Sequence, residues 1–341
     1  MTYDLLIIGG GPAGAAAGVY AARKKLKTVL ITENFYGQSV ASAEIQNWIG
    51  AKSISGMDLA RNMEEHVKSY DIEIAEGDLV EKIIPLGTSD VPNIEALNSR
   101  TSEVQKLEKQ KSINGFRVIT KSGKSFETKT ILVASGGRHR KLGVPGEEKF
   151  DGKGMVYCAT CDAPMFNRKA VAVIGAGNAG LEAARDLLSY ATKVYILEFT
   201  DKIFGDPVIF EVLKKDPRVE VIMSVEVKEV FGDLSPTKDF VGDDLLKGLK
   251  YADRNSGEVK ELAVEGIFVE IGSVPNSEIV KDLVSLNKKG EIEVDAKTQR
   301  ASLAGIWAAG DVCDTLYKQN NIAVGDAIKA VLDIQEYLNK R

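Results

Sequence analysis

The stretch DLLIIGGGPAG, residues 4–14, decides the fold of this chain. Its apolar start predicts a β-strand, and its glycines form a turn with the spacing G-x-G-x-x-G. The run Ala15–Lys25 that follows predicts a helix, and Thr28–Ile31 predicts a second strand, after which comes Glu33. This order of strand, glycine turn, helix, strand and acid is the pattern of a nucleotide-binding βαβ unit.

The same order recurs in the second half of the chain. Ala170–Ile174 predicts a strand, Gly175–Gly180 repeats the turn, Leu181–Tyr190 predicts a helix, and Lys193–Leu197 predicts a strand that ends at Glu198. One such turn is weak evidence, because glycine-rich turns are common. Two turns, each in its full context, predict an enzyme with two dinucleotide sites.

The spacing of the glycines has a physical reason. The first glycine makes the tight turn, and the second lets the backbone approach a diphosphate that rests on the helix N-terminus. The third allows close packing of helix on strand, and the acid binds ribose hydroxyls.

A closing segment near the C-terminus indicates that the first unit is split. Apolar Gly305–Ala309 runs into Gly310-Asp311-Val312, and Ile322–Leu338 has apolar residues at helical spacing. We therefore expect an α/β fold with two Rossmann-like, three-layer ββα dinucleotide-binding domains, the second inserted into the first. The expected ranges are 1–141 and 273–341 for the FAD-binding domain and 142–272 for the NAD(P)H-binding domain.

Composition narrows the class of protein. The 341 residues carry a net charge of −5, which gives no support for nucleic-acid binding. No apolar run approaches the roughly 18 residues of a transmembrane helix, and the N-terminus lacks the features of a signal peptide. Three cysteines argue against a secreted disulfide scaffold, so we expect a cytoplasmic protein that does not bind membranes.

Two of the cysteines, Cys158 and Cys161, form a C-x-x-C motif. Such pairs often have a lowered thiol pKa and exchange disulfides. A zinc site would need further ligands, and the chain offers only Cys313, His66 and His139 outside the motif. The sequence favours a redox pair over a zinc site. A thioredoxin-like domain is disfavoured, because the motif lies just before the second nucleotide unit.

Asp162 directly follows the pair. Disulfide exchange needs a group that protonates the leaving thiolate, and a carboxyl can do this; Asp162 can also be a helix N-cap. We interpret His66 and His139 as surface residues and Cys313 as a buried small residue near the flavin. Residues 85–114 read as an exposed loop or short solvated helix, with docking of a partner as the minority interpretation.

Stretches across nearly the whole chain carry a family resemblance. They are Gly9–Gly14, Glu33–Gln38, Ile45–Gly50, Ala134–Gly136, Leu142–Glu147, Tyr157–Pro164, Val171–Gly180, Gly266–Asn276 and Gly310–Gln319. Through them the chain resembles the low-molecular-weight thioredoxin reductases, most closely the flavoprotein portion of bacterial alkyl hydroperoxide reductases.

The resemblance implies site residues. For FAD these are Gly9, Gly11, Pro12, Ala13, Gly14, Glu33, Gln38, Asn47, Ala134, Gly136, Gly310, Asp311, Lys318, Gln319 and Ile322. For the nicotinamide nucleotide they are Gly175, Gly177, Asn178, Ala179, Gly180 and Glu198.

The resemblance also implies the chemistry. Cys161 would lie against the flavin, Cys158 would attack the disulfide of a protein substrate, and Asp162 would be the acid/base. Members of the family swing their two domains, and most are homodimers. No metal is implied.

Three departures from the family pattern change these expectations. The chain starts at the first FAD strand without a thioredoxin-like module, so we expect a separate thioredoxin- or glutaredoxin-like carrier, or a peroxiredoxin-system protein, as acceptor. Tyr36-Gly37-Gln38 is followed by the sequence SVASA at 39–43, which alters a loop near the flavin. Ala134-Ser135-Gly136 keeps the hydroxyl of the family's Ala-Thr-Gly.

The segment after the strand Lys193–Leu197 bears on the electron donor. It contains no arginine from 198 to 204, and Lys202 is its one cation. Glu198 would accept a hydrogen bond from a ribose 2′-hydroxyl and repel a 2′-phosphate, which predicts NADH over NADPH. Alternatives are a ferredoxin-linked reductase, an NADH oxidase, and a non-enzymatic nucleotide-sensing scaffold.

Overall fold

The computed structural model describes residues 1–42, 45–87, 113–233 and 245–341. The chain divides into two compact units. Unit 1 comprises Met1–Val40, Met57–Arg138 and Val274–Arg341, and unit 2 comprises Ala41–Gly56 and His139–Ser273. Most of the interval predicted as an exposed loop, 85–114, lies outside the described residues.

Unit 1 is built on a mixed sheet with the order β3-β2-β1-β6-β5-β4, in which β17 also pairs with β6. Strands β1, β2, β3, β6 and β17 run parallel, whereas β5 pairs antiparallel with β4 and β6. The strands are β1 (Thr2–Ile8), β2 (Thr28–Thr32), β3 (Glu73–Glu76), β4 (Val80–Gly87), β5 (Ile113–Thr120), β6 (Ser125–Val133) and β17 (Ile306–Ala308). The central strands are buried on both faces, which explains their continuous apolar sequences.

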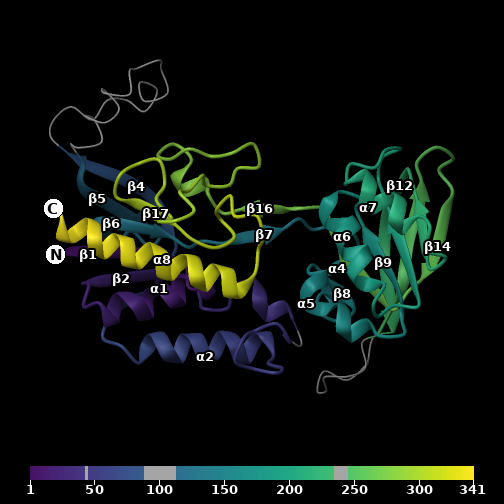
Figure 1. The fold of residues 1–341 in the computed structure, drawn as a ribbon, viewed down its shortest axis with the longest axis horizontal. Helices are drawn as coiled ribbons and strands as arrows, with labels where there is room; N and C mark the ends of the chain where they lie inside the picture. Colours follow the sequence, from purple (N-terminus) through teal and green to yellow (C-terminus); the bar gives the residue numbers. More distant parts are fainter. Residues whose placement is uncertain (43–44, 88–112, 234–244) are drawn as a thin grey trace, which may run out of the picture. The chain divides into compact units, whose positions relative to one another are not determined.

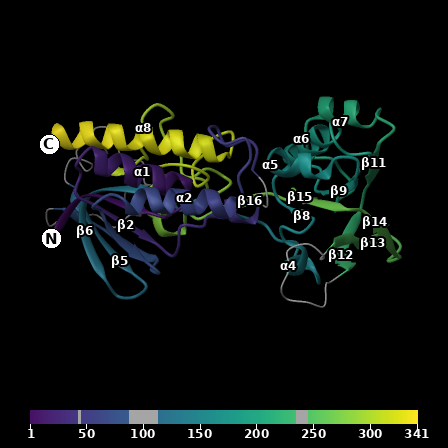
Figure 2. The same ribbon diagram turned by 90° about the horizontal axis from the view of Figure 1, so that it is seen from below.

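Helices α1 (Pro12–Arg23) and α8 (Asn320–Asn339) lie side by side in unit 1 (Figures 1 and 2). Both helices contribute alanines to one buried cluster, among them Ala17 and Ala327, both fully buried. Small side chains let the two helices approach closely. The C-terminal helix, which its apolar spacing predicted, therefore packs on α1 and belongs to unit 1. The remaining elements are η1 (Gln38–Ala41), α2 (Gly56–Lys68), β7 (Gly137–His139), β16 (Ser273–Pro275) and η4 (Glu278–Val280).

Unit 2 contains a parallel sheet with the order β11-β10-β9-β15-β8 and an antiparallel sheet, β12-β13-β14. The strands are β8 (Met155–Val156), β9 (Ala170–Ile174), β10 (Lys193–Leu197), β11 (Val219–Ile222), β12 (Val225–Asp233), β13 (Leu245–Asp253), β14 (Val259–Ala263) and β15 (Gly266–Val269). The helices are α4 (Glu147–Phe150), α5 (Ala159–Asp162), η3 (Ala163–Phe166), α6 (Asn178–Leu187) and α7 (Pro207–Leu213).

The two glycine turns have nearly identical geometry. Gly9 and Gly175 have φ angles of 107° and 105°, which favour glycine. A Cβ on Gly14 would lie 1.8 Å from the Gly9 oxygen, and one on Gly180 would lie 1.9 Å from the Gly175 oxygen. Each turn thus requires its first and third glycines, as the motif predicts.

The observed architecture confirms the expected fold class, with two Rossmann-like units of which the second is inserted into the first. The chain leaves unit 1 for the short segment Ala41–Gly56 and again after Arg138, and it returns to unit 1 at Val274. In the part of the chain that the structure describes, no helix combines the length and the apolar character needed to cross a membrane.

Candidate active site

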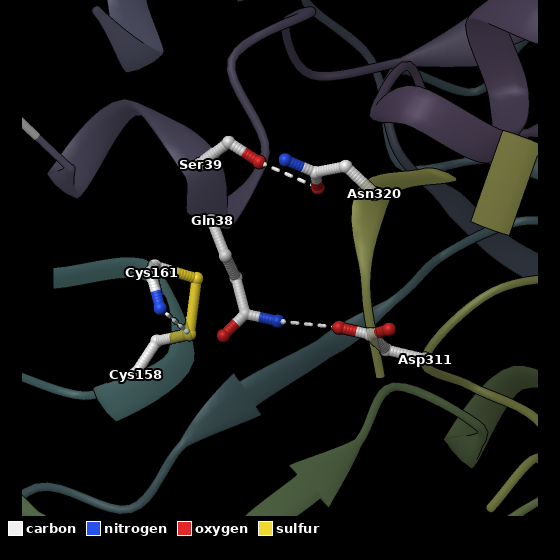
Figure 3. The surroundings of a disulfide bond; sticks show 6 residues. All are labelled: Gln38, Ser39, Cys158, Cys161, Asp311 and Asn320. Carbon is white, nitrogen blue, oxygen red and sulfur yellow. Dashed lines mark hydrogen bonds between the residues drawn. A yellow bond between two sulfur atoms is a disulfide. The ribbon is translucent and has the colours of Figure 1, made fainter. Parts of the chain in front are cut away.

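Cys158 and Cys161 form a disulfide in unit 2, with their Cα atoms 5.3 Å apart (Figure 3). Cys158 is the N-cap of α5, and its Sγ accepts a hydrogen bond from the backbone N–H of Cys161 over 3.2 Å. Both cysteines are partly exposed. A backbone donor aimed at Cys158 Sγ would stabilise a thiolate there once the disulfide opens.

Asp162 ends the same helical turn and is buried, with 3% of its surface exposed. Burial raises the pKa of its carboxyl to about 7, and a hydrogen bond with Ser42 opposes this shift. Oδ1 has no hydrogen-bond partner among the described residues. Asp162 is the N-cap residue of η3, but its side chain accepts no capping hydrogen bond there. A carboxyl with this pKa can both give and take a proton near neutral pH.

The glycine turn of unit 1 opens into a cavity of about 450 Å³. The cavity is lined by ten of the residues that the resemblance assigned to FAD. These are Gly9, Gly11, Pro12, Ala13, Glu33, Gln38, Ala134, Gly136, Gly310 and Asp311. The ends of β1, β2 and β6 therefore bring together residues from three distant parts of the sequence, as expected for a dinucleotide site at the carboxyl ends of parallel strands.

The lining of this cavity suits a dinucleotide ligand that carries hydrogen-bond donors. A Cβ added to Gly11 would meet no atom within 4 Å, which leaves the backbone free to approach a ligand. Gln38 Nε2 donates to Asp311 Oδ2 at 3.4 Å, whereas Gln38 Oε1 is buried without a partner among the described residues (Figure 3). Ser39 Oγ donates to Asn320 Oδ1 at 2.9 Å at the start of α8 (Figure 3). An unsatisfied buried acceptor is a place where a ligand donor would be stabilised.

The other residues assigned to FAD do not line this cavity. Gly14 packs α1 against β1, and Asn47 belongs to the segment of unit 2 that spans 41–56. Lys318 holds its own loop, because its Nζ donates to the carbonyl oxygens of Asp311 and Cys313 and forms an ion pair with Glu291 at 3.1 Å. Gln319 is the N-cap residue of α8, and Ile322 lies in its first turn.

A second cavity, of about 550 Å³, lies in unit 2 and is lined by Gly175 and Glu198. Gly177 is the N-cap of α6; a Cβ there would meet no atom within 4 Å, but Gly177 does not line the cavity. Asn178, Ala179 and Gly180 form the first turn of α6 and do not line the cavity. The cavity thus lies beyond the ends of β9 and β10 and does not include the start of α6.

Glu198 already accepts hydrogen bonds at both carboxylate oxygens. Oε2 accepts from Ala176 N–H at 2.8 Å, and Oε1 accepts from the backbone N–H and the Oγ1 hydroxyl of Thr200 at 2.9 Å each. A carboxylate has about four acceptor positions, so Glu198 can accept a ribose hydroxyl in addition. Its immediate role is to join the glycine turn to the segment after β10.

Arg254 is a cation near Glu198 that the sequence analysis missed. Its guanidinium lies 3.8 Å from the ring centre of Phe199, and Nη1 donates to the Phe199 carbonyl oxygen at 2.8 Å. The residue comes from the end of β13 and is separated from Phe199 by 55 positions. The two cavity-lining lysines are each ion-paired, Lys141 with Asp151 at 2.6 Å and Lys228 with Glu226 at 2.8 Å.

Three further residues considered in the sequence are His66, Cys313 and His139. His66 is exposed on α2 and Cys313 is fully buried, both as predicted; burial raises the pKa of the Cys313 thiol, which keeps it protonated. His139, which we expected to be exposed, is only partly exposed. Its ring stacks on Tyr157 with centres 5.3 Å apart, and burial lowers its pKa. The described residues contain no group of three or more His, Cys, Asp or Glu side chains arranged to hold a metal ion.

The chain is similar to a known protein family and to individual proteins of that kind. The family model of the pyridine nucleotide-disulphide oxidoreductases matches residues 3–327. An alkyl hydroperoxide reductase subunit of Pseudomonas aeruginosa is 42% identical over 336 residues, which is 98% of this chain and 58% of that protein. An NADH dehydrogenase of Bacillus subtilis is 38% identical, again over 98% of this chain and 58% of the relative. The chain thus spans a little over half the length of these relatives.

Among solved structures, thioredoxin reductase from Streptococcus pyogenes superimposes with a TM-score of 0.84 and 30% identity. The match covers 100% of this chain and 99% of that one.

Proposed function

The chain belongs to the pyridine nucleotide-disulphide oxidoreductase family, and we propose that it is an FAD-dependent disulfide reductase that passes electrons from NADH to a disulfide on a separate small protein. The observation that carries the proposal is the turn Cys158–Asp162, where a disulfide is followed by a buried carboxyl whose pKa is raised to about 7. The same unit contains a complete dinucleotide turn, Gly175–Gly180.

We assign FAD to the cavity of unit 1 and the nicotinamide nucleotide to unit 2. The unit 1 cavity has the open backbone at Gly11 and the unsatisfied oxygen of Gln38 that a large polar ligand would use. When bound, the two nucleotides would supply the electron pair that opens the disulfide. The protein's own residues bind and orient these groups and handle the proton.

The chemistry at the disulfide follows from the surroundings of each sulfur. Uptake of two electrons breaks the S–S bond and leaves a thiolate on each sulfur, one of which takes a proton from the neutral carboxyl of Asp162. The Cys161 N–H stabilises negative charge on Cys158 Sγ, which favours Cys158 as the nucleophile toward the partner's disulfide and Cys161 as the sulfur that receives electrons from the flavin. Attack of the Cys158 thiolate forms a mixed disulfide and releases one partner thiolate, which takes a proton from solvent. Cys161 then returns its proton to Asp162 and attacks Cys158 Sγ, and the second partner thiolate that leaves is protonated by Asp162.

NADH is the donor that the nucleotide cavity of unit 2 favours. Glu198 places a negative charge at the end of β10, where a 2′-phosphate would meet it. Arg254 is the nearby cation that could offset this charge, but its guanidinium is engaged by the ring and carbonyl of Phe199. Like charges in a closed site cost several kcal/mol, so the charge on Glu198 decides the preference.

We propose a small dithiol carrier of the thioredoxin or glutaredoxin type, or a peroxiredoxin-system protein, as the acceptor. Support comes from the names of the relatives, a thioredoxin reductase and an alkyl hydroperoxide reductase. A homodimer in the cytoplasm is part of the same proposal, by analogy with the family.

Anaerobic mixing experiments test this function. NADH should bleach the flavin absorbance of the wild type, and an oxidised dithiol carrier should restore it. Cys158→Ser should still bleach with NADH but should not be reoxidised by the carrier. If Cys158→Ser were reoxidised as fast as the wild type, the disulfide would have no part in turnover.

A second candidate is direct oxidation of NADH by a non-protein acceptor, as the name of the Bacillus subtilis relative suggests. This candidate predicts that Cys158→Ser keeps the full rate of NADH consumption with dioxygen or a quinone. The same variant therefore separates the two functions.

A further inference from the structure

Phe199 directly follows the acid Glu198 at the end of β10 and takes no part in the chemistry at the disulfide. It lines the unit 2 cavity, and 52% of its surface is exposed. The guanidinium of Arg254 lies 3.8 Å from the centre of the Phe199 ring and covers one face of it. The exposed half of the residue therefore includes the other face, which is left for a ligand.

The two units place the same elements around their cavities. In each unit the third parallel strand, β3 or β11, is followed by the first strand of an antiparallel set, β4 or β12. Four equivalent positions line each cavity: the first glycine of the turn, the acid after the second parallel strand, the next residue, and the start of the antiparallel strand. They are Gly9, Glu33, Asn34 and Val80 in unit 1 and Gly175, Glu198, Phe199 and Val225 in unit 2.

This repeat indicates which part of a ligand the unit 2 cavity would hold. Adenosine diphosphate is the part that FAD and NADH have in common, and the acid after the second strand binds the adenosine ribose. A diphosphate rests on the start of the helix, and the unit 2 cavity does not include the start of α6. The cavity therefore suits the adenosine, with the base next to the residue that follows the acid. That residue is Asn34 in unit 1 but an aromatic one, Phe199, in unit 2.

The rest of the lining suits a flat base. The backbone N–H of Val225 donates to the carbonyl oxygen of Glu198 at 3.0 Å, which holds the start of β12 beside the acid. A base stacked on an aromatic ring is stabilised through its π-face. A base that also packs on apolar side chains is removed from water on both faces. The further apolar residues that line the cavity are Leu142, Val144, Pro145, Val225, Val227 and Ile271.

We propose that Phe199 is the adenine-binding residue of unit 2, and that its ring stacks on the base of the bound nicotinamide nucleotide. This inference rests on the proposed binding of NADH to unit 2. Arg254 holds the ring from its far side, because its Nη1 also donates to the Phe199 carbonyl oxygen at 2.8 Å. The ring itself supplies the stacking surface, so the loss of Arg254 alone should have a small effect.

The test compares ligands with and without adenine on the FAD-loaded full chain. Calorimetry measures the binding of ADP-ribose, which lacks the nicotinamide. Anaerobic stopped-flow bleaching of the flavin compares NADH with reduced nicotinamide mononucleotide, which lacks the adenosine. Phe199→Leu keeps an apolar side chain without an aromatic face, and it should raise the Kd of ADP-ribose and the apparent Kd of NADH about tenfold. The limiting rate of bleaching and the rate constant with the mononucleotide should stay unchanged.

Two further variants are matched controls. Phe199→Tyr keeps the aromatic ring and should bind ADP-ribose within about twofold of the wild type. Tyr190→Ala removes an exposed aromatic ring that lies just after the C-terminal end of α6 and does not line the cavity. This variant should bind ADP-ribose and NADH like the wild type.

Equal binding of ADP-ribose by Phe199→Leu and the wild type would overturn the inference, while bleaching of both by NADH would leave the donor assignment intact. Equal losses with NADH and with the mononucleotide would also overturn it, because they would indicate a general change in unit 2. Phe204 is exposed after β10 but does not line the cavity, so a loss of ADP-ribose binding in Phe204→Ala alone would place the base elsewhere. If the wild type binds neither ADP-ribose nor NADH, the donor assignment fails and the inference fails with it.

Discussion

The backbone N–H of Asp162 donates a hydrogen bond to the carbonyl oxygen of Cys158 over 3.1 Å, closing the helical turn that contains the disulfide. This bond ties a buried carboxyl to Cys158 through the backbone. The position is set by local geometry, because four residues of α5 suffice to build it.

Asp162→Asn should slow reduction of the carrier disulfide by roughly 10²–10⁴-fold, the usual contribution of a general acid/base. The wild-type pH profile should show an apparent pKa of about 7, where the carboxyl changes charge, and the variant should lack it. Stopped-flow measurement of flavin reoxidation by the carrier across pH 5–9 checks both. A variant profile with the same inflection would assign the proton to another group.

The same substitution should stabilise the fold at pH 8. Because folding raises the pKa of Asp162 from 3.8 to about 7, the folded state binds more protons between these values, and stability is lost as pH rises through this range. Asp162→Asn removes the ionisation and should raise the free energy of unfolding by about 4 kcal/mol at pH 8 and by little at pH 4. Urea unfolding at the two pH values measures the difference, and an equal effect at both would contradict a burial-based shift.

Gly14→Ala and Gly180→Ala form a matched pair. Each new Cβ would lie within 2 Å of a backbone oxygen, so each should destabilise its unit by about 3 kcal/mol or more. Gly14→Ala should lose bound FAD, whereas Gly180→Ala should keep the flavin and lose NADH binding. Flavin absorbance of the purified proteins and titration with NADH distinguish the two. The opposite pattern would exchange the cofactor assignments of the units.

Glu198→Gln should weaken NADH binding and reduce the preference over NADPH. The amide NH₂ would replace one of the two oxygens that accept from Ala176 and Thr200, leaving a donor facing a donor at a cost of about 1–2 kcal/mol. KM for NADH should rise about tenfold, and the NADH-to-NADPH ratio of kcat/KM should fall. An unchanged ratio would show that the charge of Glu198 does not set the preference.

Arg254→Ala tests whether the cation stacked on Phe199 takes part in nucleotide recognition. If the guanidinium is occupied by Phe199, the loss of Arg254 should change kcat/KM by less than about threefold for both nucleotides. A selective loss of activity with NADPH would instead identify Arg254 as a phosphate-binding residue.

The glycine turns could be read from the sequence because their constraints are local. No side chain fits at Gly14 or Gly180, so the spacing itself reports the structure. The strands Ala170–Ile174 and Lys193–Leu197 have the bounds that their apolar runs predicted. The disulfide could also be predicted from the sequence, because its two cysteines belong to one C-x-x-C motif.

Other features depend on contacts between distant segments. Arg254 reaches Phe199 across 55 positions, and the pairing of β12 with β13 that brings it there has no local signal. The partial burial of His139 had no local signal, because its neighbours Arg138, Arg140 and Lys141 suggest solvent, whereas its ring packs on Tyr157. Glu270 reads as the polar end of a strand; only the fold shows that its backbone lies against the glycine turn, where a Cβ on Gly175 would come within 2.6 Å of the Glu270 carbonyl oxygen.

The most direct test of the central claim is anaerobic titration with NADH, following flavin absorbance and free thiols together. If electrons pass from FAD to Cys158–Cys161, full reduction of the wild type should consume about two equivalents of NADH and produce two new thiols, whereas a Cys158→Ser, Cys161→Ser double variant should consume about one. Complete bleaching of the wild type by one equivalent, without new thiols, would contradict the account.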